Sequence, residues 1–246
     1  MEELSYHVDF GPYYVHLNRK QKKYLAVRSV IDRVLAALAL ILLSPLFLGV
    51  SIAQKISAPD EPIFFLQKRV GKGAHCFNII KFRTMKSSAP KNVATGDLEN
   101  PQMYISKVGR FLRDTSIDEL PQLFNIIRGD MSFVGPRPER PEIIKEYCEN
   151  MPEFAFRTRV KAGLTGFAQV YGKYNTTPYD KLKLDLFYIE NYSFWMDLKL
   201  ILMTVKTVLK KDATEGVAEG QVTAQKDVAD QDPESVEEIV KEIVKK

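Results

Sequence analysis

Two adjacent carboxylates, Asp118 and Glu119, are the residues of this chain whose types and spacing best suit catalysis. Ser116 lies three residues before Glu119, which is the spacing of a capping box. Pro121 is tolerated only in a first turn, so we expect a helix that begins near Asp118. Its apolar face would carry Leu120, Leu123, Phe124 and Ile127. Free N–H groups at a helix N-terminus attract phosphate, although an aspartate there also serves as a simple cap.

A stiff basic turn follows this helix at residues 135–138, which read Gly-Pro-Arg-Pro. The two prolines restrict the backbone on either side of Arg137. A guanidinium held on a rigid turn is suited to bidentate phosphate binding. The carboxylate pair and the basic turn together predict a site for a phosphorylated substrate.

An ordered set of short motifs surrounds these residues and resembles the signature of the bacterial sugar transferases, also called monotopic phosphoglycosyl transferases. The matching segments are K-F-R-T-M at 81–85, S-x-D-E-L at 116–120, F-N at 124–125, G-D-M-S at 129–132 and G-P-R-P at 135–138. Residues 157–169 resemble a further motif of the family, with Ala162 in place of its proline. A lone Asp-Glu pair carries no information, whereas this ordered set is specific. The resemblance covers about residues 28–211.

The resemblance implies an activity and a role for each site residue. Family members transfer a sugar-1-phosphate from a UDP-sugar to polyprenyl (undecaprenyl) phosphate and release UMP, which starts exopolysaccharide, capsule or glycan assembly. Asp118 would form a covalent aspartyl-phosphosugar intermediate, because a carboxylate ionised at neutral pH needs no separate base. Glu119, together with Asp118, would bind Mg²⁺. Lys81, Arg113 and Arg137 would hold the diphosphate.

An apolar run of about twenty residues, from Val34 to Ala53, has the length of a membrane-spanning helix. Ser44-Pro45 stands at its centre, and a proline there should kink or break the helix. Both flanks are basic, which favours keeping both on the cytoplasmic side. A kinked transmembrane helix and a re-entrant helix are both compatible with this pattern. The resemblance favours the re-entrant form, since the family carries a Ser-Pro break in such a helix.

These segments predict an α+β, mostly helical fold, with a re-entrant membrane helix, amphipathic interfacial helices and a small β-hairpin. We divide the chain into a membrane-proximal arm (1–27), the re-entrant helix (28–56), a catalytic domain (57–211) and an acidic linker with a short amphipathic helix (212–246). Within the catalytic domain we expect strands at 63–65 and 77–85 around a basic loop at 67–73, and helices at 141–150 and 180–211. The last helix would present an apolar face of Leu198, Ile201, Leu202, Val205, Val208 and Leu209.

Charge and composition bound the compartment and the partners. The net charge is +4, but the segment from Asp212 onward has ten acidic and four basic residues, which leaves +10 on the part before it. This basic body favours anionic partners, and we expect a UDP-sugar, polyprenyl phosphate and membrane lipid rather than nucleic acid. Two cysteines and three histidines show no metal-ligand spacing. We therefore predict an enzyme on the cytoplasmic face of the cell membrane.

Two other functions and several properties stay open on the sequence alone. The chain could be a catalytically inactive, membrane-anchored scaffold that binds polyanions, or a regulatory protein that works through its acidic tail. The identity of the sugar is not encoded by any motif we recognise. A homo-oligomer is also left open.

Overall fold

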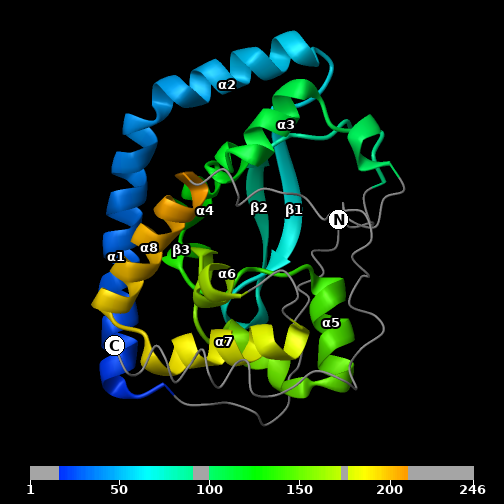
Figure 1. Cartoon of the computed structure of the whole chain (residues 1–246). Helices are drawn as coiled ribbons and strands as arrows, with labels where there is room; N and C mark the ends of the chain where they lie inside the picture. Colours follow the sequence, from blue (N-terminus) through cyan, green and yellow to red (C-terminus); the bar gives the residue numbers. More distant parts are fainter. Residues whose placement is uncertain (1–16, 91–99, 173–176, 210–246) are drawn as a thin grey trace, which may run out of the picture.

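The computed structural model describes residues 17–90, 100–172 and 177–209, which are mostly helical with two small sheets (Figure 1). This confirms the predicted α+β, mostly helical class. A bent pair of helices borders a body made of the remaining elements. The predictions for residues 1–16 and 212–246, including the acidic linker and the last amphipathic helix, lie outside the described residues.

The apolar run forms two helices, α1 (Arg19–Leu42) and α2 (Ser44–Ser57), that meet at an angle of 60°. The break falls at the predicted place. Pro45 lies in the first turn of α2, where its missing N–H removes no helical hydrogen bond, and the Ser44 hydroxyl donates to the Ile41 carbonyl at 2.7 Å. No single described helix is long and apolar enough to cross a membrane, whereas the bent pair together is. α1 begins at Arg19, so residues 19–27, predicted as an arm, are helical.

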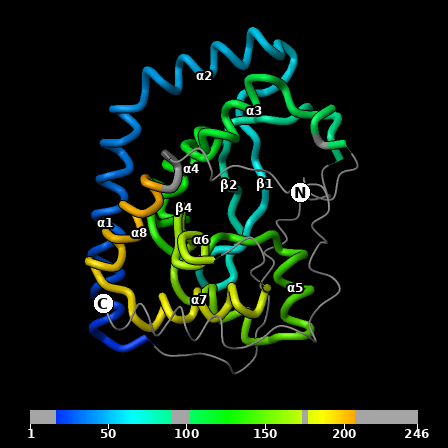
Figure 2. The backbone as a smooth tube through the Cα atoms, in the orientation of Figure 1, coloured from blue at the N-terminus to red at the C-terminus, as the bar shows by residue number. Residues whose placement is uncertain are grey.

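The first half of α1 is tied to the body by a buried polar cluster. The Arg28 guanidinium donates to the Tyr188 hydroxyl at 2.7 Å and to the Val134 carbonyl, and it forms an ion pair with Asp197 at 3.1 Å. The Tyr24 hydroxyl also donates to Asp197, at 2.9 Å. Tyr188 belongs to α7 (Pro178–Asn191) and Asp197 to α8 (Phe194–Leu209), which runs beside α1 in Figure 2. Buried charges need such partners, so α1 docks at a defined angle.

The predicted hairpin is present, with a longer first strand and a shorter second strand than expected. β1 (Phe64–Val70) pairs antiparallel with β2 (Cys76–Phe82), and a short 3-10 turn, η1 (Lys72–Ala74), joins them. The prediction of a basic loop at 67–73 is wrong for Gln67 to Val70, which continue β1. Exposed and half-buried side chains alternate along β1, so that Lys68 and Arg69 lie on opposite faces of the strand. β2 ends at Phe82 rather than at Met85.

The elements after the hairpin include the turn that carries the carboxylate pair. They are η3 (Pro101–Met103), α3 (Lys107–Asp114), η4 (Ile117–Glu119), α4 (Gln122–Arg128), β3 (Met131–Val134), α5 (Pro141–Asn150), η5 (Pro152–Arg159), β4 (Ala162–Thr165) and α6 (Phe167–Tyr171). The helix predicted at 141–150 is confirmed. The sequence analysis missed the parallel pairing of β3 with β4, whose partners are about thirty residues apart in the chain. The single helix predicted at 180–211 is wrong, because the described part forms α7 and α8 with a break at Tyr192-Ser193.

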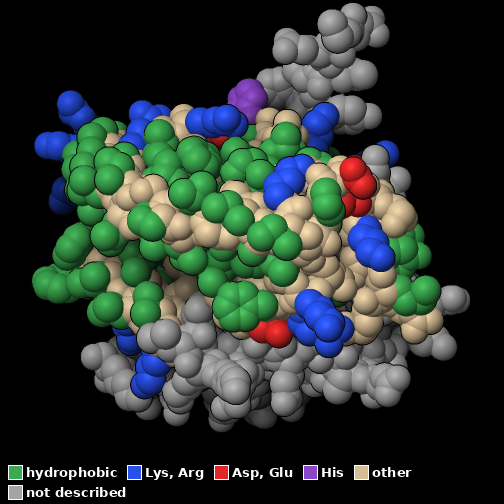
Figure 3. Space-filling model, turned by 90° about the horizontal axis from the view of Figure 1, so that it is seen from above, with side chains coloured by type: hydrophobic (Ala, Val, Ile, Leu, Met, Phe, Trp, Pro, Cys, Tyr) green, Lys and Arg blue, Asp and Glu red, His purple; other side chains and the backbone are tan. Residues whose placement is uncertain are grey.

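A broad apolar surface covers α1, α2 and α8. Leu42, Leu48 and Ile56 are exposed on the bent pair, and Trp195, Leu202 and Val205 on α8. Figure 3, seen from above the molecule of Figure 1, shows apolar side chains gathered over much of one face, with Lys and Arg side chains among and around them. On the predicted apolar face of α8, Leu198, Leu202 and Val205 are exposed and Ile201 is half-buried, while Leu200 is buried in the core. The side chains of Val208 and Leu209 lie outside the described residues. Patches of this kind mark a surface that is covered by a membrane or by another protein.

Candidate active site

The carboxylate pair lies on a 3-10 turn, η4, and α4 begins only after Pro121. The predicted capping box is wrong. Ser116 adopts a left-handed conformation with φ 54° and its side chain makes no cap, while its carbonyl accepts from the Glu119 amide at 3.2 Å. Asp118 and Glu119 therefore stand one turn before α4.

The face of α4 that packs inward also differs from the prediction. Leu123 and Ile126 are buried and pack against Ile79 of β2. The polar side chains of Gln122 and Asn125 are buried as well. Phe124 and Ile127, which we placed on the core face, are only partly buried. α4 is thus anchored on β2, and this contact sets the distance between the strand and the carboxylate pair.

Glu119 is held by two of the three cations that the sequence analysis assigned to phosphate binding. The Lys81 ammonium lies 2.7 Å from Glu119 Oε1, and Arg137 Nη2 lies 2.9 Å from the same oxygen, with a second contact at 3.5 Å to Oε2. Burial alone would raise the pKa of Glu119, but Arg137 and Lys81 outweigh it and hold that pKa well below its ordinary value. Glu119 is therefore ionised at any physiological pH.

Asp118 behaves differently from its neighbour. Burial raises the pKa of Asp118 to about 6, and the negative charge of Glu119 adds to the effect, while Lys81, Arg113 and Arg137 oppose it. Among the described residues the ion pairs fall on Glu119 and not on Asp118. Asp118 is thus a mostly ionised, poorly solvated carboxylate among three cations at neutral pH, which suits a nucleophile toward an anionic substrate.

The turn that carries Arg137 is held by two guanidinium groups, of which that of Arg157 is buried and that of Arg69 is half-buried. Arg157 donates to the Arg137 carbonyl at 3.0 Å and pairs with Asp185 at 2.5 Å. Arg69 donates to the Pro138 carbonyl at 3.1 Å. Sequence reasoning credited the stiffness of this turn to its prolines and gave Arg69, Arg157 and Asp185 no role there. Only the position of Arg157 at the start of a family-like motif signalled it.

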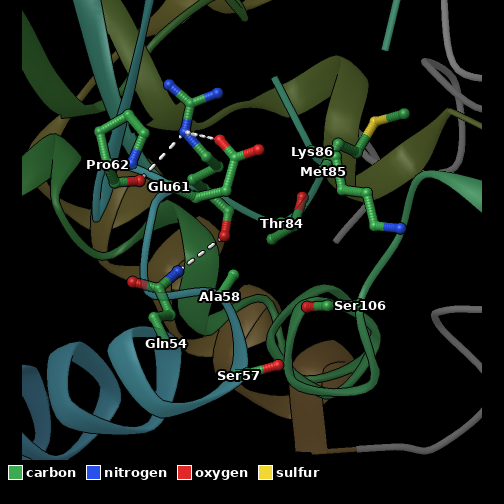
Figure 4. A pocket seen from close by; sticks show the side chains of 10 residues that line it. Gln54, Ser57, Ala58, Glu61, Pro62, Thr84, Met85, Lys86 and Ser106 are labelled. Carbon is green, nitrogen blue, oxygen red and sulfur yellow. Dashed lines mark hydrogen bonds and ion pairs between the residues drawn. The ribbon is translucent and has the colours of Figure 1, made fainter. Parts of the chain in front are cut away.

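A small pocket lies away from the carboxylates, where the end of α2 meets the residues that follow β2 (Figure 4). Gln54 donates to the Arg83 carbonyl at 2.7 Å, and Arg83 donates to the Pro62 carbonyl at 3.0 Å. The cavity measures about 30 Å³. A cavity of that size holds one or two water molecules. We therefore interpret this pocket as part of the contact between α2 and β2 rather than as a substrate site.

The described residues contain no group of three or more His, Cys, Asp and Glu side chains that could hold a metal ion. This does not count against Mg²⁺, which usually binds one or two protein carboxylates plus substrate phosphates. Asp118 and Glu119 supply donors of that kind. Both oxygens of Glu119 contact cations, however, so this carboxylate fits the ion only once phosphate groups draw Lys81 or Arg137 away.

Comparison with known proteins identifies relatives of this chain. Residues 23–211 match the family model described as "Bacterial sugar transferase". The UDP-N-acetylgalactosamine-undecaprenyl-phosphate N-acetylgalactosaminephosphotransferase of Aeromonas hydrophila is 36% identical, over 76% of this chain and 44% of the relative. The UDP-glucose:undecaprenyl-phosphate glucose-1-phosphate transferase of Caulobacter vibrioides is 41% identical, over 75% of this chain and 70% of the relative. The enzyme of the same name from Escherichia coli K12 is 39% identical, over 71% of this chain and 38% of the relative. The match thus spans less than half of the Aeromonas and Escherichia proteins.

Proposed function

Because the chain belongs to the bacterial sugar transferase family, we propose that it transfers a sugar-1-phosphate from a UDP-sugar to undecaprenyl phosphate or another polyprenyl phosphate. The observation that carries this proposal is the placement of Asp118, an ionised and poorly solvated carboxylate, among Lys81, Arg113 and Arg137. The names of the relatives supply the two substrate classes. They differ in the sugar that they transfer, so the sugar stays unassigned.

The chemistry of Asp118 is a double displacement. A carboxylate oxygen of Asp118 attacks the sugar-bearing phosphorus, and the bond from that phosphorus to the bridging oxygen breaks, so that UMP leaves with the electron pair. An oxygen of the lipid phosphate then attacks the same phosphorus and expels Asp118 as a carboxylate. The product is a polyprenyl diphosphate sugar. No general base is required, because both nucleophiles are already anions.

The cations around Glu119 act by changing partners. In the structure described here Lys81 and Arg137 neutralise Glu119. A diphosphate offers stronger, multiply charged acceptors, so both cations would turn toward it and hold the phosphorus in line with Asp118. With Lys81 and Arg137 on the diphosphate, Glu119 would be free to hold Mg²⁺ together with Asp118. When bound, Mg²⁺ would neutralise charge that develops on the departing UMP.

The membrane placement rests on the apolar surface and on the two ends of the bent helix. The first half of α1 is tied to α7 and α8 through Arg28, and the end of α2 is tied to β2 through Gln54. Both ends therefore meet the same body, which supports a helix that enters and returns by one face. Such a helix would keep the carboxylates near the head groups on the cytoplasmic face, within reach of a lipid phosphate.

Turnover in a defined membrane tests this function. Full-length protein in nanodiscs receives undecaprenyl phosphate, MgCl₂ and one UDP-sugar at a time, with UDP-glucose and UDP-N-acetylgalactosamine first. We expect UMP and a lipid-linked sugar diphosphate in equal amounts with at least one donor. Omission of the lipid from a reaction with radiolabelled sugar should leave label on the protein. No UMP from any donor, with binding of polyanions intact, would favour the inactive scaffold instead.

A further inference from the structure

The outer edge of β2 is closed by a side chain instead of a strand. β2 pairs with β1 along one edge only. On the other edge the Ile80 amide donates to Asn125 Oδ1 at 3.0 Å, and Asn125 Nδ2 donates to the Asn78 carbonyl at 2.8 Å. The side-chain amide of Asn125 thus occupies both positions that one residue of a parallel third strand would take.

The surroundings of Asn125 show that this pairing is directional and buried. Asn125 has no exposed surface, and Leu123, Ile126 and Ile79 form the apolar contact between α4 and β2. The amide nitrogen of Asn125 also donates to the Asp130 carboxylate at 3.3 Å. Apolar packing holds α4 on β2 but fixes no register, since such contacts are non-directional. Two hydrogen bonds of near-ideal length do fix it, and loss of either would leave a buried backbone group unpaired.

The two elements joined by Asn125 carry the two sides of the active site. Lys81 follows Ile80 directly on β2, and Glu119 lies on the turn that leads into α4. The Lys81–Glu119 contact of 2.7 Å therefore sits one residue from the Asn125 hydrogen bonds on one element and six residues from them on the other. We propose that Asn125 is a positioning residue that sets Lys81 against the Asp118–Glu119 pair. This inference rests on the proposed function and adds to it a residue that touches no substrate.

The test replaces Asn125 without adding charge. Asn125→Leu has a similar size and removes both hydrogen bonds to β2, together with the one to Asp130. The matched control is Asn78→Ala, because Asn78 contributes only its backbone carbonyl and its side chain is exposed. Both are compared with wild type in nanodiscs by turnover, by the pH dependence of kcat/KM and by hydrogen exchange of peptides that cover β2.

We expect Asn125→Leu to lower kcat at least tenfold and to speed exchange in β2 while the rest of the body keeps its protection. The acid limb of kcat/KM should also move to higher pH, because Lys81 is the first of the cations that oppose protonation of Asp118. Asn78→Ala should change none of these. Unchanged turnover and an unmoved acid limb in a folded Asn125→Leu would overturn the proposal, as would a loss that only follows the folded fraction.

A second variant covers the case in which Asn125→Leu does not fold. Asn125→Asp keeps the acceptor for the Ile80 amide but sets a second oxygen against the Asn78 carbonyl, so the same drop in kcat and the same faster exchange in β2 are expected. If Asn125→Asp keeps the turnover of the wild type and the hydrogen exchange of β2 is unchanged, the proposal is overturned. Failure of the proposed function is a separate result, since it appears as absent turnover in the wild type, and the exchange of β2 still tests the contact itself.

Discussion

Replacement of Asp118 by asparagine should abolish turnover and also stabilise the protein at neutral pH. Asparagine keeps the size of the side chain but cannot attack phosphorus as a carboxylate does, so the covalent intermediate does not form. Stabilisation is expected because the folded protein must keep Asp118 ionised in a poorly solvated place. A catalytic group held at a cost to stability is common at active sites.

The size of this effect follows from the pKa of Asp118, which burial raises from 3.8 to about 6. The folded state then binds the proton more tightly than the unfolded chain, so ionisation of Asp118 opposes folding. The opposition is complete above about pH 6 and disappears below about pH 4. A shift of about two pH units corresponds to at most about 3 kcal/mol, since Asp118 is partly solvated. One kcal/mol moves the melting temperature of a domain of this size by about 2–4 °C.

Two assays measure the two halves of this prediction. Thermal unfolding of wild type and Asp118→Asn in detergent, between pH 4 and pH 8, should give a higher melting temperature for the variant at pH 7 and converging values at pH 4. Asp114→Asn is the matched control, because Asp114 is exposed on α3 and the same substitution there should change little. In parallel, radiolabelled sugar phosphate should accumulate on the wild type without lipid acceptor, and not on Asp118→Asn.

Either half can refute the reasoning. A variant that melts lower than wild type at pH 7, or a difference that does not shrink on acidification, would show that Asp118 is not held ionised at a cost. Turnover at the wild-type rate would remove Asp118 as the nucleophile. In the wild type, kcat/KM should fall about tenfold between pH 7 and pH 5, and a flat profile to pH 5 would contradict the raised pKa.

Three further predictions address the cations, the turn and the membrane helix. Arg137→Ala should lower kcat/KM by about 30- to 1,000-fold, the effect of about 2–4 kcal/mol expected for a preorganised donor to the transferred phosphate, and a change below threefold would leave Arg137 a structural role. Arg157→Met should cost about 3–5 kcal/mol in unfolding free energy, because Asp185 stays buried without its partner. A second change, Asp185→Leu, should recover stability in denaturant titrations but not turnover, which still lacks the hold on the Arg137 carbonyl. For a re-entrant helix, single cysteines at positions 10 and 90 of a cysteine-free variant should resist an impermeant maleimide until cells are lysed, whereas Ser44→Ala with Pro45→Leu should expose position 10 in a fraction of molecules. Labelling of position 10 from outside with the natural helix would establish a spanning topology.

Local sequence rules were reliable where neighbours in the chain decide the structure. Pro45 breaks the apolar run at the predicted place, and the helix at Pro141–Asn150 begins and ends as predicted. The same rules misplaced features that distant contacts decide. Ser116 has the spacing of a cap, but the packing of α3 and α4 turns it into a left-handed conformation. The basic run that resembles a loop extends β1, because β2 supplies hydrogen-bond partners that no local pattern reveals.

The sequence by itself determined which groups we propose for the chemistry, because the Asp118–Glu119 pair and the stiff turn around Arg137 are readable as residue types in a fixed order. Only the tertiary structure decided how these groups share their charges. Lys81 and Arg137 meet at Glu119, while burial leaves Asp118 with a raised pKa, although Lys81, the Asp118–Glu119 pair and Arg137 stand in three separate segments of the chain. In our proposal, the contact of Lys81 with Glu119 depends on the pairing of Asn125 with β2. The residues of that pairing, Ile80 and Asn125, are 45 positions apart in the sequence, and no periodicity encodes it. Pairwise electrostatics and buried hydrogen bonds act through space, so their outcome follows from the packing of distant elements rather than from the order of residues.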